Sequence, residues 1–141
     1  MFTHTYRIKT QAVELADLWR VWADVNQWAV WQSDVAYVQL ETAFETGGHF
    51  IFKPNGAPKL KLGLTYVSPE RSFTDMTRFI GAQLLGTHEF IQHEDGVEII
   101  ISLSLSGILS GLWLHLVVND IVKSLPAQTE ALIARAIEVR G

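Results

Sequence analysis

The sequence predicts an α+β fold in which a seven-stranded antiparallel sheet is covered on one face by a long C-terminal helix. Three observations predict it: seven segments alternate like strands, turn residues separate consecutive segments, and an apolar stripe at helical spacing ends the chain. Consecutive hairpins make a sheet antiparallel, and such a sheet buries one face against other elements. The 141 residues contain no repeat, linker or low-complexity tract, so we expect one domain over 1–141.

The first strand and two short helices are predicted before the hairpins begin. Residues 3–9 alternate and are rich in strand formers, which predicts the first strand. The segment from Val13 to Ala23 is predicted to form an amphipathic helix, because large apolar side chains recur at helical spacing at Leu15, Leu18, Trp19 and Trp22. Asn26 is a predicted N-cap for a short second helix that contains Trp28 and Trp31.

Six further strands follow, each bounded by turn residues. They are predicted at Val35–Thr42, His49–Lys53, Lys59–Val67, Arg71–Phe79, Gln83–His93 and Val97–Ser106. The predicted turns and strand ends are Gly47-Gly48, Asn55-Gly56, Pro69, Gly81 and Asp95-Gly96. Alternation in the third of these strands places four side chains on one face, namely Leu60, Leu62, Leu64 and Tyr66.

The chain ends in a predicted helix from about Asn119 to Val139. Its apolar stripe consists of Val118, Ile121, Val122, Leu125, Leu132, Ile133 and Ala136. Pro126 lies inside this helix and has no N–H to donate to the carbonyl of Val122, so we expect a kink.

The segment from Ile99 to Val118 contains no Lys, Arg, Asp or Glu and is long enough to cross a bilayer. Its serines and leucines alternate between residues 102 and 106, however, which is the period of a half-buried strand, and Gly107 then interrupts the pattern. We therefore predict a strand, a turn and the start of a helix, with no membrane span. No secretory signal precedes it, and a soluble, cytoplasmic protein is expected.

Composition excludes several classes of function. Apolar residues make up 48% of the chain, which excludes a disordered protein, and 11 Lys+Arg against 15 Asp+Glu argue against nucleic-acid binding. The absence of cysteine excludes disulfides, thiolate metal sites and cysteine nucleophiles. The five histidines have no metal-ligand spacing and no carboxylate cluster beside them, so neither a metal nor a cofactor is expected.

Five segments carry a resemblance to a known family: LWRVWADVNQWAVW (Leu18 to Trp31), ETGGHFIFKP (Glu45 to Pro54), LTYVSPERSFTD (Leu64 to Asp75), THEFIQHEDGVEIIISLSLSG (Thr87 to Gly107) and LPAQTEALIARA (Leu125 to Ala136). Together, over essentially the whole chain, they resemble the SRPBCC superfamily of polyketide cyclase/dehydrase and lipid-transport proteins. The resemblance implies a helix-grip (START-like) fold, in which a curved sheet grips the C-terminal helix around an apolar cavity. Members bind lipids, sterols or polyketides, and some are aromatase/cyclases.

The resemblance and the strand faces together predict the residues of a ligand site. The predicted lining is Trp28, Trp31, Phe50, Phe52, Leu64, Tyr66, Phe73, Thr77, Gly86, His88, Phe90, Leu114, Ile121 and Leu125. Trp28 and Trp31 form either a lid at the cavity mouth or part of the core, and Trp19 and Trp22 are expected in the core.

His88 and Asp75 are the candidate catalytic residues. His88 shares a strand face with Leu84, Gly86 and Phe90, so an inward imidazole could bind a ligand carbonyl or act as a base, with Gly86 leaving room for the ligand. Asp75 and Thr77 share a face on the preceding strand, where Asp75 could orient His88. A one-residue slip would turn Asp75 to solvent, and His88 could equally be a hydrogen-bonded core residue.

Three functions remain open from the sequence. The first is binding or carriage of a small hydrophobic, lipid- or polyketide-like ligand. The second is a metal-free enzyme of cyclase, dehydratase or aromatase type that uses His88 as acid/base. The third is an interaction module whose cavity is filled by its own side chains. The sequence leaves the oligomeric state open between a monomer and a homodimer.

Overall fold

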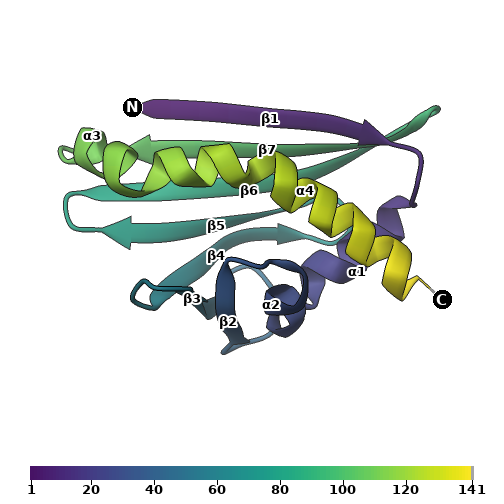
Figure 1. Cartoon of the computed structure of the whole chain (residues 1–141), viewed down its shortest axis with the longest axis horizontal. Coiled ribbons are helices and arrows are strands. Elements are labelled where there is room, and N and C mark those ends of the chain that lie inside the picture. The colour runs from purple at the N-terminus through teal and green to yellow at the C-terminus, as the bar shows by residue number, and fades with distance from the viewer. Residues whose placement is uncertain (141) are drawn as a thin grey trace.

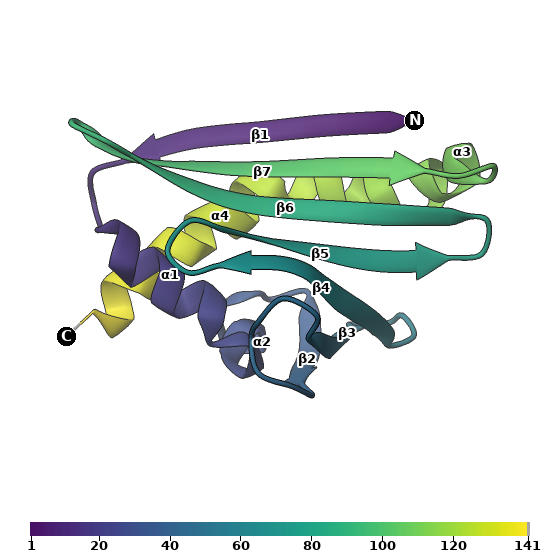
Figure 2. The same ribbon diagram turned by 180° about the vertical axis from the view of Figure 1, so that it is seen from behind.

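A computed structural model describes residues 1–140 and confirms the predicted α+β fold. All seven strands form one antiparallel sheet in the order β1-β7-β6-β5-β4-β3-β2. The long C-terminal helix lies across one face of this sheet, as Figure 1 shows from the helix side and Figure 2 from behind. The strands are β1 (Phe2–Thr10), β2 (Val35–Leu40), β3 (His49–Pro54), β4 (Leu60–Ser68), β5 (Ser72–Phe79), β6 (Ala82–His93) and β7 (Gly96–Ser106).

Strand β7 accounts for the long segment without charged side chains. Ile99, Ile101, Leu103 and Leu105 are all buried on the face toward the helix, and the serines between them point to the other face. Among residues 1–140, no helix is long and apolar enough to cross a membrane.

The chain between β1 and β2 forms two helices, α1 (Leu15–Ala23) and α2 (Trp28–Trp31), joined by a 3₁₀ turn (Val25–Gln27). The predicted N-cap role of Asn26 is wrong, because Asn26 lies inside that turn. Its side-chain oxygen instead accepts a hydrogen bond from the backbone N–H of Leu40 at 2.7 Å. Asn26 therefore ties the helix pair to the edge strand β2.

A register shift in β4 changes which of its side chains face the helix. Leu62 and Leu64 are buried as predicted, but the pairing with β5 shifts between Leu64 and Tyr66. Val67 then lies opposite Phe73 and packs on the core, while Tyr66 is 52% exposed. Tyr66 is therefore not on the inner face, because a bulge inverts the alternation of the residues beyond it.

The C-terminal helix begins soon after Gly107, where the sequence predicted the start of a helix, and so extends beyond the apolar stripe predicted from about Asn119. It starts as α3 (Ser110–Trp113), continues through a π-helical turn (Leu114–Val118) and becomes α4 (Asn119–Val139). Pro126 lies within α4, and Figure 1 shows the helix changing direction partway along α4. The bend carries the end of α4 across α1, against which it packs.

An aromatic cluster around Phe73 forms the centre of the core. The Phe73 ring is fully buried, stacks on the imidazole of His88 with centroids 4.3 Å apart, and meets the edge of Trp22 at 5.2 Å. Trp19 is half-buried and lies against Phe44 and Phe73. Trp22 and Trp19 thus both pack in the core, as predicted.

One ion-pair cluster on the outer face links stability to pH. The hydrogen bond between His93 Nε2 and Glu98 Oε1 (2.9 Å) is the main cause that lowers the pKa of Glu98, and Arg7 lowers it further. A lowered carboxyl pKa stabilises the fold above the unfolded-state value of about 4.3, and this contribution disappears as pH falls through the folded-state pKa.

We therefore expect Glu98→Gln to make the fold less sensitive to acid. The drop in melting temperature between about pH 7 and pH 3 should be smaller in this variant than in the unmodified protein, because the amide does not titrate. Glu94→Gln, at an exposed neighbouring position, is the control and should keep the original pH dependence. An unchanged pH dependence in Glu98→Gln would refute this role.

Candidate functional site

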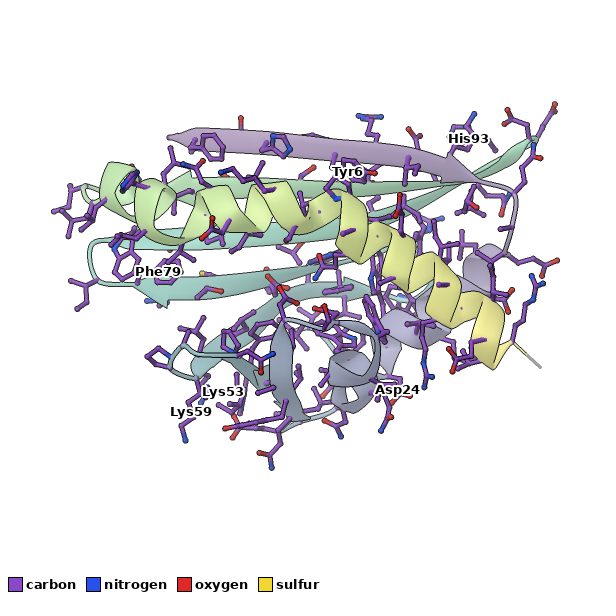
Figure 3. All side chains as sticks on the ribbon, in the orientation of Figure 1. Tyr6, Asp24, Lys53, Lys59, Phe79 and His93 are labelled. Atoms are coloured by element: carbon purple, nitrogen blue, oxygen red, sulfur yellow. The ribbon has the colours of Figure 1, made fainter. Side chains whose placement is uncertain are left out.

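A cavity of about 380 Å³ lies between the inner face of the sheet and the C-terminal helix. Strands β3 to β7 form one wall, the π-helical turn and α4 form the opposite wall, and α1 and α2 contribute tryptophans. Phe79 lies at the far end of β5, beneath the first turns of the C-terminal helix, where Figure 3 labels it. The side chains of the sheet and the helix thus leave a space of this size between them.

Ten of the predicted site residues line this cavity. They are Trp28, Trp31, Phe52, Phe73, Asp75, Thr77, Gly86, His88, Ile121 and Leu125. Gly86 and His88 of β6 face the cavity, and so do Asp75 and Thr77 of β5, whose orientation the sequence left open.

Five predicted lining residues do not reach the cavity. Phe50 and Leu64 are fully buried in the core, and Tyr66 lies outside because of the bulge in β4. Phe90 is covered by Trp22, on which it stacks at 4.1 Å. Leu114 is displaced because the π-helical turn has more residues per turn than an α-helix and rotates Leu116 and Val117 to the cavity instead.

The sequence analysis missed several lining residues. Trp22 was assigned to the core alone, but its ring both packs on Phe73 and lines the cavity. Gln32 and Gln128 line it as well, and the Gln128 side-chain amide donates to the Gln32 oxygen at 2.9 Å. This hydrogen bond ties α4 to the segment after α2, and nothing in the sequence pairs two residues so far apart.

Asp75 and His88 form a polar pair on neighbouring strands inside the cavity. The β5–β6 register places Phe73 opposite His88 and Asp75 opposite Gly86. The Asp75 carboxylate oxygen Oδ2 lies 3.4 Å from His88 Nε2, and the two side chains are only 14% and 18% exposed. Strand pairing therefore brings together the two residues that the sequence proposed as a site.

Gly86 makes room for the carboxylate of Asp75. A Cβ at position 86 would lie 2.9 Å from Asp75 Oδ1, closer than carbon and oxygen normally approach. The sequence analysis expected Gly86 to leave room for a ligand. Gly86 does line the cavity, and Asp75 occupies part of the space above it.

The two ring nitrogens of His88 have different surroundings. Nδ1 is buried and has no hydrogen-bond partner, whereas Nε2 faces the Asp75 carboxylate. A carboxylate only accepts, and a proton on Nδ1 would be a buried N–H without an acceptor, so Nε2 is the ring nitrogen suited to carry a proton toward Asp75.

The tryptophans of α2 pack against the core and also line the cavity. Trp28 is buried, meets Phe50 edge-on, and donates its indole N–H to the Trp22 carbonyl at 3.1 Å. Trp31 is half-buried and its indole N–H is covered without a partner. Both rings line the cavity, so α2 is a packed wall of it.

Comparison with known proteins identifies the fold. No family model and no curated protein sequence matches this chain. A hypothetical protein, jhp0584 from Helicobacter pylori, superposes with a TM-score of 0.78 at 12% identity over 96% of this chain and 88% of its own. Ara h 8.0201 superposes with a TM-score of 0.73 at 9% identity, and the match covers 97% of this chain and 99% of its own. The chain has a helix-grip fold.

A further helix-grip structure was solved with small molecules. Norcoclaurine synthase from Thalictrum flavum, in complex with dopamine and hydroxybenzaldehyde, superposes with a TM-score of 0.72 at 13% identity. The match covers 99% of this chain and 90% of that one. At these identities the likeness establishes the fold alone.

Proposed function

We propose that this protein binds a small hydrophobic molecule in the cavity between its sheet and its C-terminal helix, as a binding or carrier protein. The observation that carries the proposal is the cavity itself, about 380 Å³ in volume, within the range of small-molecule sites. Six aromatic side chains line it, from Trp22, Trp28, Trp31, Phe52, Phe73 and Phe79. Rigid aromatic walls with few polar groups favour apolar ligands.

Two further points support this proposal. The motif series that resembles the SRPBCC superfamily agrees with the helix-grip fold, and we propose membership of that superfamily. In norcoclaurine synthase the same fold holds small molecules that contain aromatic rings. Both points make an internal ligand the expected use of the cavity.

Native mass spectrometry of the purified protein, followed by denaturing extraction, tests the proposal first. We expect either a co-purifying apolar molecule or, in an empty protein, one bound equivalent of a hydrophobic fluorescent dye that added lipids or aromatic compounds displace. A protein that is empty and binds no dye would contradict the proposal, as would a dye that no apolar competitor displaces.

The Asp75–His88 pair favours a second function, an enzyme of cyclase, dehydratase or aromatase type. Such reactions need a proton acceptor beside the bound substrate, and the pair lies in the cavity wall. The two functions differ in the response to His88→Ala. An enzyme should lose its turnover, whereas a binding protein should lose only a modest part of its affinity.

A further inference from the structure

We infer that the preferred ligand carries a protonated amine attached to an apolar, ring-containing body. This rests on the proposed binding function and adds the chemical class of the ligand. The inference comes from the charges along the cavity wall and from the aromatic rings between them.

All the charged side chains that line the cavity are acidic. Asp75 lies inside, and Asp34 and Asp120 lie at exposed positions on its wall. No Lys or Arg lines the cavity among residues 1–140. A carboxylate or phosphate on the ligand would therefore be repelled, whereas an ammonium group would be attracted.

Asp75 is the carboxylate best placed to hold such a group. The side chain is 14% exposed, so its charge is screened less by solvent than a surface charge. His88 Nε2 lies 3.4 Å from this carboxylate, and no Lys or Arg among residues 1–140 lines the cavity beside it. Charge-assisted hydrogen bonds between an ammonium and a carboxylate are among the stronger polar contacts in proteins.

The aromatic walls strengthen the same preference. Phe73 precedes Asp75 on the inner face of β5, and Trp22 packs against both Phe73 and His88. Ring faces attract cations, most strongly when water is excluded. An ammonium group near Asp75 would therefore meet a carboxylate and aromatic rings at once.

The basic residues next to the lining do not line the cavity themselves. Three of them are at exposed positions, namely Lys61, Arg78 and Lys123. Lys53 lies between the lining residues Phe52 and Pro54, but does not line the cavity itself. Its ammonium donates to the Pro54 carbonyl at 2.9 Å. Figure 3 shows Lys53 and Lys59 near β3 and β4, away from the C-terminal helix.

Three naphthyl compounds with different polar groups on a two-carbon side chain test the inference: naphthylethylamine, naphthylethanol and naphthylacetate. Isothermal titration calorimetry should give the amine at least about tenfold tighter binding than the alcohol, and the carboxylate the weakest binding. The preference should persist in about 0.5 M NaCl, because the charge inside the cavity is shielded from salt. Equal affinities, or tighter binding of the carboxylate, would overturn the inference and leave the binding function standing.

Asp75→Asn locates the source of the preference. The amide keeps the shape of the side chain, so we expect alcohol binding to change less than about threefold while the amine preference falls to near unity. Asp24→Asn, at an exposed position outside the cavity, removes the same net charge and should keep the preference. A preference unchanged in Asp75→Asn would overturn the role of Asp75. If none of the three compounds binds the unmodified protein while the hydrophobic dye still does, this inference fails and the binding function stands; if the dye does not bind either, both fail.

Discussion

Replacing Phe73 by alanine should lower the free energy of unfolding by about 3–5 kcal/mol. The ring is fully buried and lies within ring–ring contact distance of five other aromatic side chains, those of Trp19, Trp22, Trp28, Phe44 and His88. Its removal would leave a void at the junction of α1, α2 and β5, where rigid rings cannot close it. Urea unfolding followed by circular dichroism measures the change.

Phe73→Leu is the matched control for this substitution. Leucine keeps most of the apolar volume and loses the ring stacking with His88, so a smaller loss of stability is expected. A loss below about 1 kcal/mol in Phe73→Ala would mean that the aromatic cluster does not hold the helices on the sheet.

Filling the cavity should abolish ligand binding. Ser124 lies on α4 and lines the cavity, so Ser124→Trp would place an indole in the space that a ligand needs. We expect the affinity for the dye, or for whichever naphthyl compound binds best, to fall at least about 100-fold. Equilibrium titration measures this loss, and thermal unfolding confirms that the variant is folded.

Lys123→Trp controls for the added bulk. Lys123 is the preceding residue on α4 and is exposed, so the same indole would lie outside the cavity and leave affinity unchanged. Equal affinities in the two variants would show that the ligand binds elsewhere.

The strand pattern of the sequence predicted most of the fold and part of the site. Alternation placed His88 on the same face of β6 as Phe90, but it left the orientation of Asp75 on β5 open. The structure turns Asp75 toward the cavity, opposite Gly86. The helical stripe likewise predicted that Ile121 and Leu125 face the sheet, and both line the cavity. The period of apolar residues therefore predicts which side of a strand or helix is buried wherever one side is apolar.

The predictions for Tyr66 and Leu114 were wrong because the backbone departs from its regular period near both residues. A bulge in β4 turned Tyr66 outward, and a π-helical turn exchanged Leu114 for Leu116 and Val117. Neither irregularity has a signal in the sequence, because both depend on how the element packs against its neighbours. The function of Gly86 was hidden for a related reason, since it depends on the side chain opposite in the sheet.

The indole N–H signals of the five tryptophans offer the most direct test of a ligand inside the cavity. Trp22, Trp28 and Trp31 line it, whereas Trp113 lies on α3 at the end of the sheet, with its indole N–H bonded to the Ile80 carbonyl at 2.7 Å. Trp113 does not line the cavity, and its sequence neighbours Leu109 and Leu112 are exposed. A ligand that binds on the surface of α3 would therefore shift the Trp113 signal most.

The measurement is a ¹H–¹⁵N correlation spectrum with and without naphthylethanol, which probes the cavity without a charge. Binding inside the cavity predicts that the indole signals of Trp22, Trp28 and Trp31 shift more than that of Trp113. The largest shift at Trp113, or no shift in any indole signal at saturating ligand, would contradict an internal binding site.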